Sequence, residues 1–157
     1  MNKNIPDIYN SILELAWHFG NHGFNGECCG DLSLVEFMAL KKIQESDNIT
    51  IQETGNTLNF TKSGASKIID RLETKGYVAR EISPIDGRVC CVNATTKGIE
   101  VIKNIIEEYS TYVDKMLKEF DSDTIENIKS VLEILTVAAQ STEMHKKPQL
   151  LTMKGRI

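Results

Sequence analysis

The chain of 157 residues has a net charge of −4, with 41% hydrophobic and 25% charged residues. This composition is typical of a globular domain, and a negative total charge argues against a protein that coats nucleic acid through bulk charge. No apolar run reaches the ~18 residues of a membrane span, and the first residues lack the pattern of a signal peptide. We therefore expect a cytoplasmic protein with no membrane partner, whose four cysteines are reduced thiols.

Charge is distributed unevenly along the chain. From Thr61 to Arg88, six cations against four acids give a local charge of +2. From Glu100 to Glu143, four cations against ten acids give −6. A polyanion is therefore expected to meet the middle of the chain rather than its C-terminal third.

The first part of the chain predicts two helices joined by a loop. Apolar residues repeat at helical spacing over residues 5–19, which predicts a first helix with one apolar face. Four glycines in residues 20–31 predict a loop. Ser33 and Glu36 form a capping box, so that the next helix is expected over residues 34–43.

A second capping box, Thr50 with Glu53, predicts a short helix over residues 51–58. After a break, residues 62–76 predict another helix, and Gly76 stands where a helix C-terminus favours a left-handed residue. Apolar residues at helical spacing give this helix one buried face. That face is expected to contain Ala65, Ile68, Ile69 and Leu72.

The hydrophobic period then changes from helical to alternating. Residues 77–83 and 88–94 are rich in residues that favour strands, and Asp86-Gly87 between them predicts a β-hairpin. Helical spacing returns after Thr95.

Two further helices are predicted in the last third of the chain. A heptad-like apolar seam from Ile99 to Phe120 predicts a long helix. Asp123 and Glu126 are expected to open a last helix, and residues 146–157 form a tail.

This order predicts a mainly α fold with a small β-hairpin wing, which is a winged helix-turn-helix domain with a helical dimerisation region. In such a unit the second helix of the helix-turn-helix enters the major groove. The hairpin can place Arg88 in the neighbouring minor groove, where a narrow groove concentrates negative potential. Hydroxyl and lysine side chains on the outer helix face suit contacts with phosphates and base edges.

The stretch that begins at Leu72 resembles the MarR-type (MarR/SlyA) transcriptional regulators. Their signature is a helix end LExKGxVxR, a wing with Asp-x-Arg, and a following LTxxG. Residues 72–80 match the first part, Asp86 and Arg88 match the wing pair, and Thr95 and Gly98 match the last part. Combined with the outer helix face, the resemblance gives a set of expected DNA contacts. They are Thr61, Lys62, Ser63, Ser66, Lys67, Arg71, Asp86 and Arg88.

The chain departs from the signature at two positions. Ala94 replaces the usual leucine, and Gly87 replaces a residue that is often a second arginine. The resemblance implies one MarR-like domain over residues 1–157, with the winged unit at 32–98. It also implies a homodimer that binds a pseudo-palindromic operator in double-stranded DNA, with residues 1–24 and 99–145 as the dimerisation region.

The expected function is that of a dimeric transcriptional regulator, and specifically a repressor relieved by a small-molecule, redox or metal effector. The alternative is a winged-helix module that binds protein and not DNA. An enzyme is not expected, because the sequence lacks a nucleophile with a base at helical spacing, a phosphate loop and a paired carboxylate site. No cofactor is required.

The cysteines form two vicinal pairs. Cys90 and Cys91 lie on a predicted strand, so their side chains point to opposite faces and cannot easily bind one metal ion. Cys28 and Cys29 lie in the predicted loop. His18 and His22 are four residues apart and share a helix face.

Imidazoles and thiols are ligands for zinc or copper, so this region is a candidate metal site. The same thiols, and the outward one of Cys90 and Cys91, are candidate redox sensors, and the alternative is that all four are ordinary thiols. Family regulators bind small, often aromatic, ligands between the dimer helices and the winged domain. The resemblance offers candidate residues for such a pocket, which are equally candidates for the core. They are Trp17, Phe19, Phe24 and Phe37.

Overall fold

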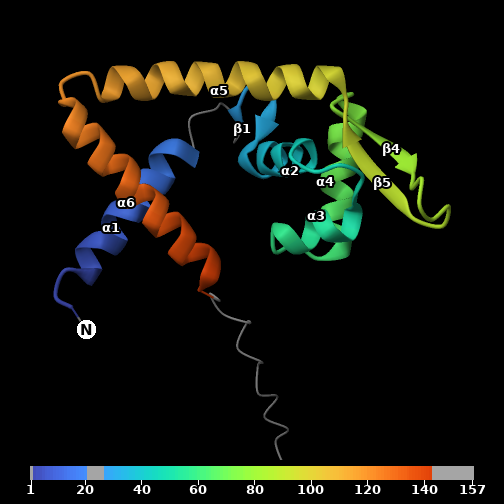
Figure 1. Ribbon diagram of the computed structural model, residues 1–157, viewed down its shortest axis with the longest axis horizontal. Helices are drawn as coiled ribbons and strands as arrows, with labels where there is room; N and C mark the ends of the chain where they lie inside the picture. Colours follow the sequence, from blue (N-terminus) through green and yellow to red (C-terminus); the bar gives the residue numbers. More distant parts are fainter. Residues whose placement is uncertain (1, 21–26, 143–157) are drawn as a thin grey trace, which may run out of the picture. The chain divides into compact units, whose positions relative to one another are not determined.

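The computed structural model describes residues 2–20 and 27–142, without the side chains of Glu27 and Cys28. It divides into two compact units, Met1–Thr111 and Tyr112–Ile157. Figure 1 shows the elements in sequence colours. In chain order they are α1 (Ile5–Gly20), β1 (Glu27–Cys29), β2 (Leu32–Ser33), α2 (Leu34–Gln44), β3 (Ile49–Thr50), α3 (Ile51–Thr57), α4 (Lys62–Thr74), β4 (Val78–Ile82), β5 (Cys90–Ala94), α5 (Thr96–Met116) and α6 (Ser122–Ser141).

The fold is mainly α with one small sheet, as predicted. No helix within the described ranges combines the length and apolarity that a membrane crossing requires.

Both predicted capping boxes are present. At the start of α2 the Ser33 hydroxyl accepts a hydrogen bond from the backbone N–H of Glu36 at 3.2 Å, and the Glu36 carboxylate accepts one from the N–H of Ser33 at 2.9 Å. Thr50 and Glu53 repeat this exchange at the start of α3. Each box satisfies backbone N–H groups that a helix N-terminus leaves without partners.

A close contact between two helices defines the helix-turn-helix. Gly55 in α3 lies so near α4 that a Cβ atom there would stand 3.0 Å from the Cβ of Ala65. Between the helices, Asn59 adopts a left-handed conformation with φ 57°, and the N–H of Phe60 donates to the carbonyl of Gly55 at 2.8 Å. This tight turn brings α4 across α3 with its apolar face inward.

The helix α4 ends in a Schellman motif. Gly76 has φ +79°, its N–H donates to the carbonyl of Glu73 at 2.9 Å, and the N–H of Tyr77 donates to the carbonyl of Leu72 at 2.9 Å. This confirms the prediction for Gly76 and turns the chain directly into β4.

The core of the winged unit is formed by α2, α4 and α5 packed against the sheet. All four residues of the predicted inner face of α4 are buried, and α5 contributes Ile102 and Ile105. The core residues are Cys29, Leu32, Ala39, Leu40, Ile43, Ile49, Ile68, Ile69, Leu72, Tyr77, Val78, Val92, Ile102 and Ile105.

The wing differs from the prediction in two respects. It belongs to a three-stranded antiparallel sheet of order β3-β5-β4, and the two-residue strand β3 was not predicted. The loop between β4 and β5 covers residues 83–89, and Gly87 does not adopt a positive φ. The Asp-Gly pair therefore lies within a longer loop and does not form a two-residue hairpin turn.

Other boundaries also need correction. The predicted loop at residues 20–31 contains β1, which pairs with β2, so that Cys28 and Cys29 lie on a strand. The helix α6 begins at Ser122 and not at Asp123, and Asp121 is its N-cap, since the Asp121 carboxylate accepts the N–H of Thr124 at 2.8 Å. The helix α5 ends before Phe120. The predicted tail lies outside the described residues.

The helices α1 and α6 have no buried residues in this structure. Each nevertheless exposes large apolar side chains. In α1 these are Ile5, Ile8, Tyr9, Ile12, Leu13, Leu15 and Trp17, and in α6 they are Ile125, Val131, Leu132, Ile134, Leu135 and Val137.

A junction of backbone atoms fixes the start of α5. Thr95 donates its N–H to the carbonyl of Tyr77 at 3.0 Å and its hydroxyl to the carbonyl of Gly76 at 2.7 Å. The same hydroxyl accepts the N–H of Gly98 at 3.1 Å. A Cβ atom on Gly98 would stand 2.1 Å from the Tyr77 carbonyl oxygen, so only glycine fits here.

Replacing Gly98 with alanine should destabilise the protein. Alanine usually stabilises a helix relative to glycine, but here the methyl group collides with a backbone carbonyl, and overpacking of this kind costs about 1–3 kcal/mol. We expect Gly98→Ala to lower the melting temperature by several degrees in a thermal unfolding scan. Gly87→Ala is the control, since a Cβ there meets nothing within 4 Å. Equal melting temperatures for the two variants would contradict the close approach.

A second set of contacts joins the start of α2 to the end of α4. Lys75 donates to the buried carboxylate of Glu36 at 3.1 Å and to the carbonyl of Asp31, and the Tyr77 hydroxyl donates to Asp31 at 2.9 Å. Burial raises the pKa of Glu36, but the Ser33 N–H and Lys75 outweigh it, so that the pKa lies below its ordinary value of 4.5.

Because the pKa of Glu36 is lowered in the folded state, its ionised carboxylate stabilises the fold fully above pH 4.5. This contribution is lost as the pH falls through the folded-state pKa of Glu36. We expect Glu36→Gln to lower the free energy of unfolding at pH 7 by roughly 1–3 kcal/mol, as for a charged hydrogen bond. Denaturant unfolding at several pH values should show this difference shrinking below pH 4.5. Glu45→Gln, in an exposed pair with Lys41, is the control. A difference that is the same at all pH values would rule out the ionised pair as its cause.

Candidate nucleic-acid interface

The outer face of α4 presents the predicted polar residues to solvent. Lys62, Ser63, Lys67 and Arg71 are exposed, and Ser66 is half-buried. Thr61 is the N-cap, and its hydroxyl accepts the N–H of Gly64 at 3.1 Å. The face therefore combines short hydroxyl side chains, long cations and the positive end of a helix of 13 residues.

Arg80 changes the charge of this face, and its role was not predicted. It extends from β4 and forms ion pairs with both Asp70 and Glu73, the two acids of α4. The hydrogen bond to Asp70 contributes most to raising the guanidinium pKa, and Glu73 adds to it. The acids are thus neutralised from the side of the sheet, while the other cations of the helix remain available.

The cations available on α4 and in the wing are Lys62, Lys67, Arg71 and Arg88. None of them takes part in an ion pair within the ranges that the structure describes. In the sequence, Asp70 and Glu73 lie about one helical turn apart and Arg80 follows them. The ion pairs between these residues depend on the position of β4 beside α4, which only the structure shows.

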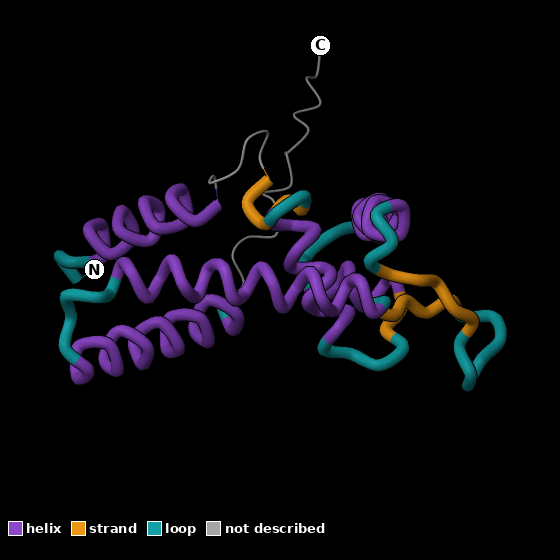
Figure 2. The backbone as a smooth tube through the Cα atoms, turned by 90° about the horizontal axis from the view of Figure 1, so that it is seen from above, coloured by secondary structure: helices purple, strands orange, loops and turns teal. Residues whose placement is uncertain are grey.

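The wing carries Arg88 near its tip. In Figures 1 and 2 the β4–β5 hairpin extends past α4, with its loop at the far end. Arg88 is exposed. The Asp86 carboxylate accepts the backbone N–H of Arg88 at 3.0 Å, and no ion pair joins these two described side chains. Asp86 therefore holds the backbone of Arg88 in place.

The cysteines whose side chains are described differ in their exposure to solvent. Cys90 is exposed and Cys91 is buried, as expected for neighbours on a strand. Cys29 is also buried, which does not suit an accessible redox thiol. The side chain of Cys28 lies outside the described residues.

The candidate metal site at His18, His22, Cys28 and Cys29 is only partly described, so it stays a prediction. His22 lies outside the described ranges, beyond the end of α1 at Gly20. The ring of His18 packs edge-on against Phe19, with centroids 5.6 Å apart. Within the described ranges no three His, Cys, Asp or Glu side chains are grouped closely enough to hold a metal ion.

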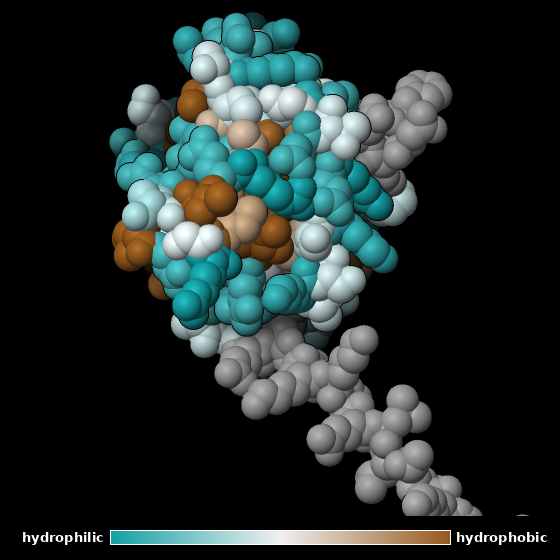
Figure 3. Space-filling view, turned by 90° about the vertical axis from the view of Figure 1, so that its right-hand side faces the viewer, coloured by the Kyte–Doolittle hydropathy of each residue, from teal (hydrophilic) through white to brown (hydrophobic). Residues whose placement is uncertain are grey.

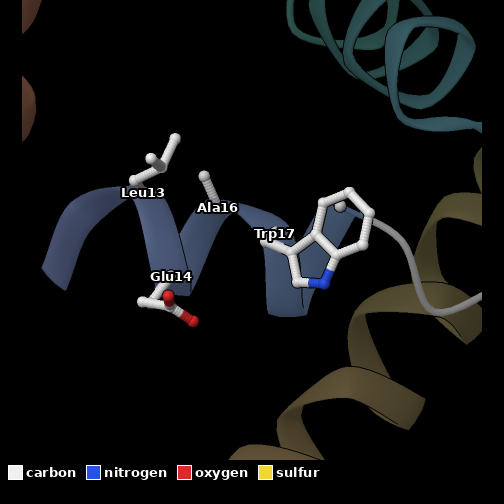
Figure 4. Close-up of a pocket in the computed structure, with 5 residues that line it drawn as sticks. Leu13, Glu14, Ala16 and Trp17 are labelled. Carbon is white, nitrogen blue, oxygen red and sulfur yellow. The ribbon is translucent and has the colours of Figure 1, made fainter. Parts of the chain in front are cut away.

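The candidate effector pocket is only partly described. Trp17 is 71% exposed and borders a shallow hollow on α1 that also involves Leu13, Glu14 and Ala16. Figure 4 shows Leu13 and Ala16 pointing to one side of this helix and Glu14 to the other. Phe37 packs against the core of the winged unit, and Phe24 is not described. The pocket therefore stays a prediction.

Comparisons with known proteins agree with the fold. The model of the MarR family matches residues 32–90, the part that contains the helix-turn-helix and most of the wing. The regulator MhqR of Bacillus subtilis, named an HTH-type transcriptional regulator, is 24% identical over 140 residues, which cover 88% of this chain and 90% of the relative. This relative is named a regulator and not an enzyme, in agreement with the prediction.

Solved structures show the same architecture. A MarR family protein from Bacillus stearothermophilus superimposes with a TM-score of 0.76 at 22% identity, covering 88% of this chain and 98% of the other. FabT of Streptococcus pneumoniae, solved in complex with DNA, gives 0.62 at 21% identity, covering 88% and 94%. The chain is thus similar to the MarR family of transcriptional regulators in sequence over residues 32–90, and it shares the fold of MarR proteins over most of its length.

Proposed function

We propose that this protein is a homodimeric, sequence-specific DNA-binding repressor that places α4 in the major groove and the wing in the adjacent minor groove. The observation that carries the proposal is the charge arrangement on α4. Arg80 pairs with both acids of the helix, so the surface offered to DNA retains Lys62, Lys67 and Arg71 without competing carboxylates.

The small side chains of α4 support close approach to a base-pair edge. Ser63 and Ser66 lie between the exposed lysines Lys62 and Lys67, so that the cations can reach phosphates while the hydroxyls face the groove floor. Arg88 extends the positive surface beyond the helix to the wing. The DNA complex of FabT, which has the same fold, gives a precedent for DNA binding by this architecture.

Exposed apolar surface on the helices supports a dimer. In the second unit, Val113, Leu117, Ile125 and Leu132 line an apolar groove, and α6 has no buried residue at all. Contiguous apolar surface of this kind is typical of an interface, and a two-fold arrangement would present two α4 helices to a pseudo-palindromic operator.

Repression is proposed to be relieved by an effector, which is a small molecule, an oxidant or a metal ion. An effector that binds one arrangement of the two winged units more tightly shifts the population away from the spacing that fits the operator. DNA binding itself requires no cofactor in this scheme. Trp17, exposed on α1, is the described residue best placed to report effector binding through its fluorescence.

Charge changes on the proposed surface should weaken DNA binding. With a duplex selected from a random pool by the unmodified protein, we expect Lys67→Glu to lower affinity at low salt by roughly tenfold or more. Arg88→Ala should lower affinity and reduce the slope of log K against log salt by about one. Titration of labelled duplex at several salt concentrations measures both quantities.

Lys103→Glu is the matched control, because Lys103 is exposed on α5 outside the proposed surface. It makes the same change in total charge as Lys67→Glu. An equal loss for these two variants would show that only bulk charge matters. Failure of the unmodified protein to select any duplex would exclude DNA binding and favour a winged-helix module that binds protein.

The dimer can be tested in the absence of DNA. We expect the unmodified protein to sediment as a dimer at micromolar concentration. Leu132→Glu, which places a charge in the apolar groove of the second unit, should shift the mass towards a monomer. Asn127→Glu, which adds the same charge at an exposed polar position of α6, should leave the mass unchanged. A monomeric unmodified protein would contradict the proposal.

A further inference from the structure

The tip of the wing is a closed turn in which the polar side chains bind the backbone. The Ser83 hydroxyl accepts the N–H groups of Ile85 and Asp86 at 3.2 and 3.3 Å. The backbone closes around them, since Ser83 donates its N–H to the carbonyl of Val89 at 2.8 Å and Val89 donates to Asp86 at 3.0 Å. Ser83 and Asp86 thereby fix the loop and leave other side chains to face outward.

The most exposed of these side chains is apolar. Ile85 is 96% exposed, more than any other large hydrophobic residue in the described ranges. Glycine, proline, asparagine, aspartate and serine are the common residues of turns, whereas an exposed isoleucine keeps apolar surface in water whose burial would be favourable. Figure 3 views the molecule from the wing side and shows apolar surface bordered by hydrophilic surface. A binding partner that covers Ile85 would remove the unfavourable exposure of this side chain to water.

The neighbouring charges indicate which occupant fits. Arg88, three residues away, is exposed and forms no ion pair within the described part of the chain. The carboxylate of Asp86 accepts the N–H of Arg88, which satisfies one oxygen inside the turn. An apolar side chain beside an available cation matches the minor groove, where deoxyribose walls offer C–H surface and phosphates line the rim.

We propose that Ile85 is an apolar minor-groove contact, which packs against deoxyribose next to the phosphate or base contact of Arg88. This inference rests on the proposed DNA binding and adds a residue that contributes affinity without charge. The Ser83 hydroxyl holds the backbone of the turn at Ile85 and Asp86, so that less backbone entropy is lost when the groove covers Ile85. Because the minor groove varies in width with sequence, the contact also favours duplexes whose groove accepts a branched side chain.

The test compares Ile85→Ala with the unmodified protein on the duplex selected from a random pool. We expect affinity to fall roughly tenfold, the loss when a half-covered isoleucine loses its outer carbons. The salt dependence should not change, in contrast to Arg88→Ala, because no charge is removed. Hydroxyl-radical cleavage, which reports on minor-groove sugars, should show protection flanking each half-site that weakens in Ile85→Ala.

Ile82→Ala is the matched control, since Ile82 is 73% exposed on β4, away from the tip. It should change affinity less than twofold, and both variants should melt at the temperature of the unmodified protein. Unchanged affinity and footprint in Ile85→Ala, with tight binding by the unmodified protein, would overturn this inference alone. Absence of DNA binding by the unmodified protein would overturn the proposed function as well.

Discussion

The contact between the Tyr77 carbonyl and the first turn of α5 is the constraint on which the winged unit depends. At this point the end of α4, the start of β4 and the start of α5 meet within a few backbone atoms. Gly76 turns the chain after α4, Thr95 ties α5 to that turn through two hydrogen bonds, and Gly98 leaves room for the carbonyl. The orientation of α4 relative to the wing follows from this junction.

Lys97 reinforces the same junction from outside. Its ammonium group donates to the carbonyl of Lys75 at 2.8 Å and lies 5.0 Å from the centre of the Tyr77 ring. A cation at the C-terminus of a helix is favourable because it faces the negative end of the helix dipole. The helix α4 and the wing are thus held by one connection, as the proposed binding to two adjacent grooves with fixed spacing requires.

Local features of the sequence predicted much of this arrangement. Ser33 and Thr50 each predict a helix start, because each forms a capping box with the glutamate three residues further on. Gly76 predicts a helix end, because glycine favours the left-handed conformation found there. Such signals need no knowledge of the rest of the chain. The apolar period of α4 was equally clear, because its buried residues recur on one face.

The features that sequence reasoning missed depend on contacts distant in the chain. The strand β3 has two residues and exists because β5 pairs with it. Arg80 neutralises Asp70 and Glu73 only because β4 lies beside α4. The loop at residues 83–89 is longer than Asp-Gly suggested, since Ser83 and Val89 close it from further away. The positive charge of the candidate interface was therefore predicted, while the neutralisation of its two acids by Arg80 was not.

The most direct measurement of the central claim is the sequence of the DNA that the protein selects from a random pool, together with the guanines whose N7 methylation blocks binding. Two α4 helices in successive major grooves predict two half-sites related by two-fold symmetry, with centres about 10 base pairs apart or a multiple of that. Interference should fall within the half-sites. Two results would contradict the account. One is a pool without enrichment, and the other is a single asymmetric site whose guanines can be methylated at N7 without loss of binding.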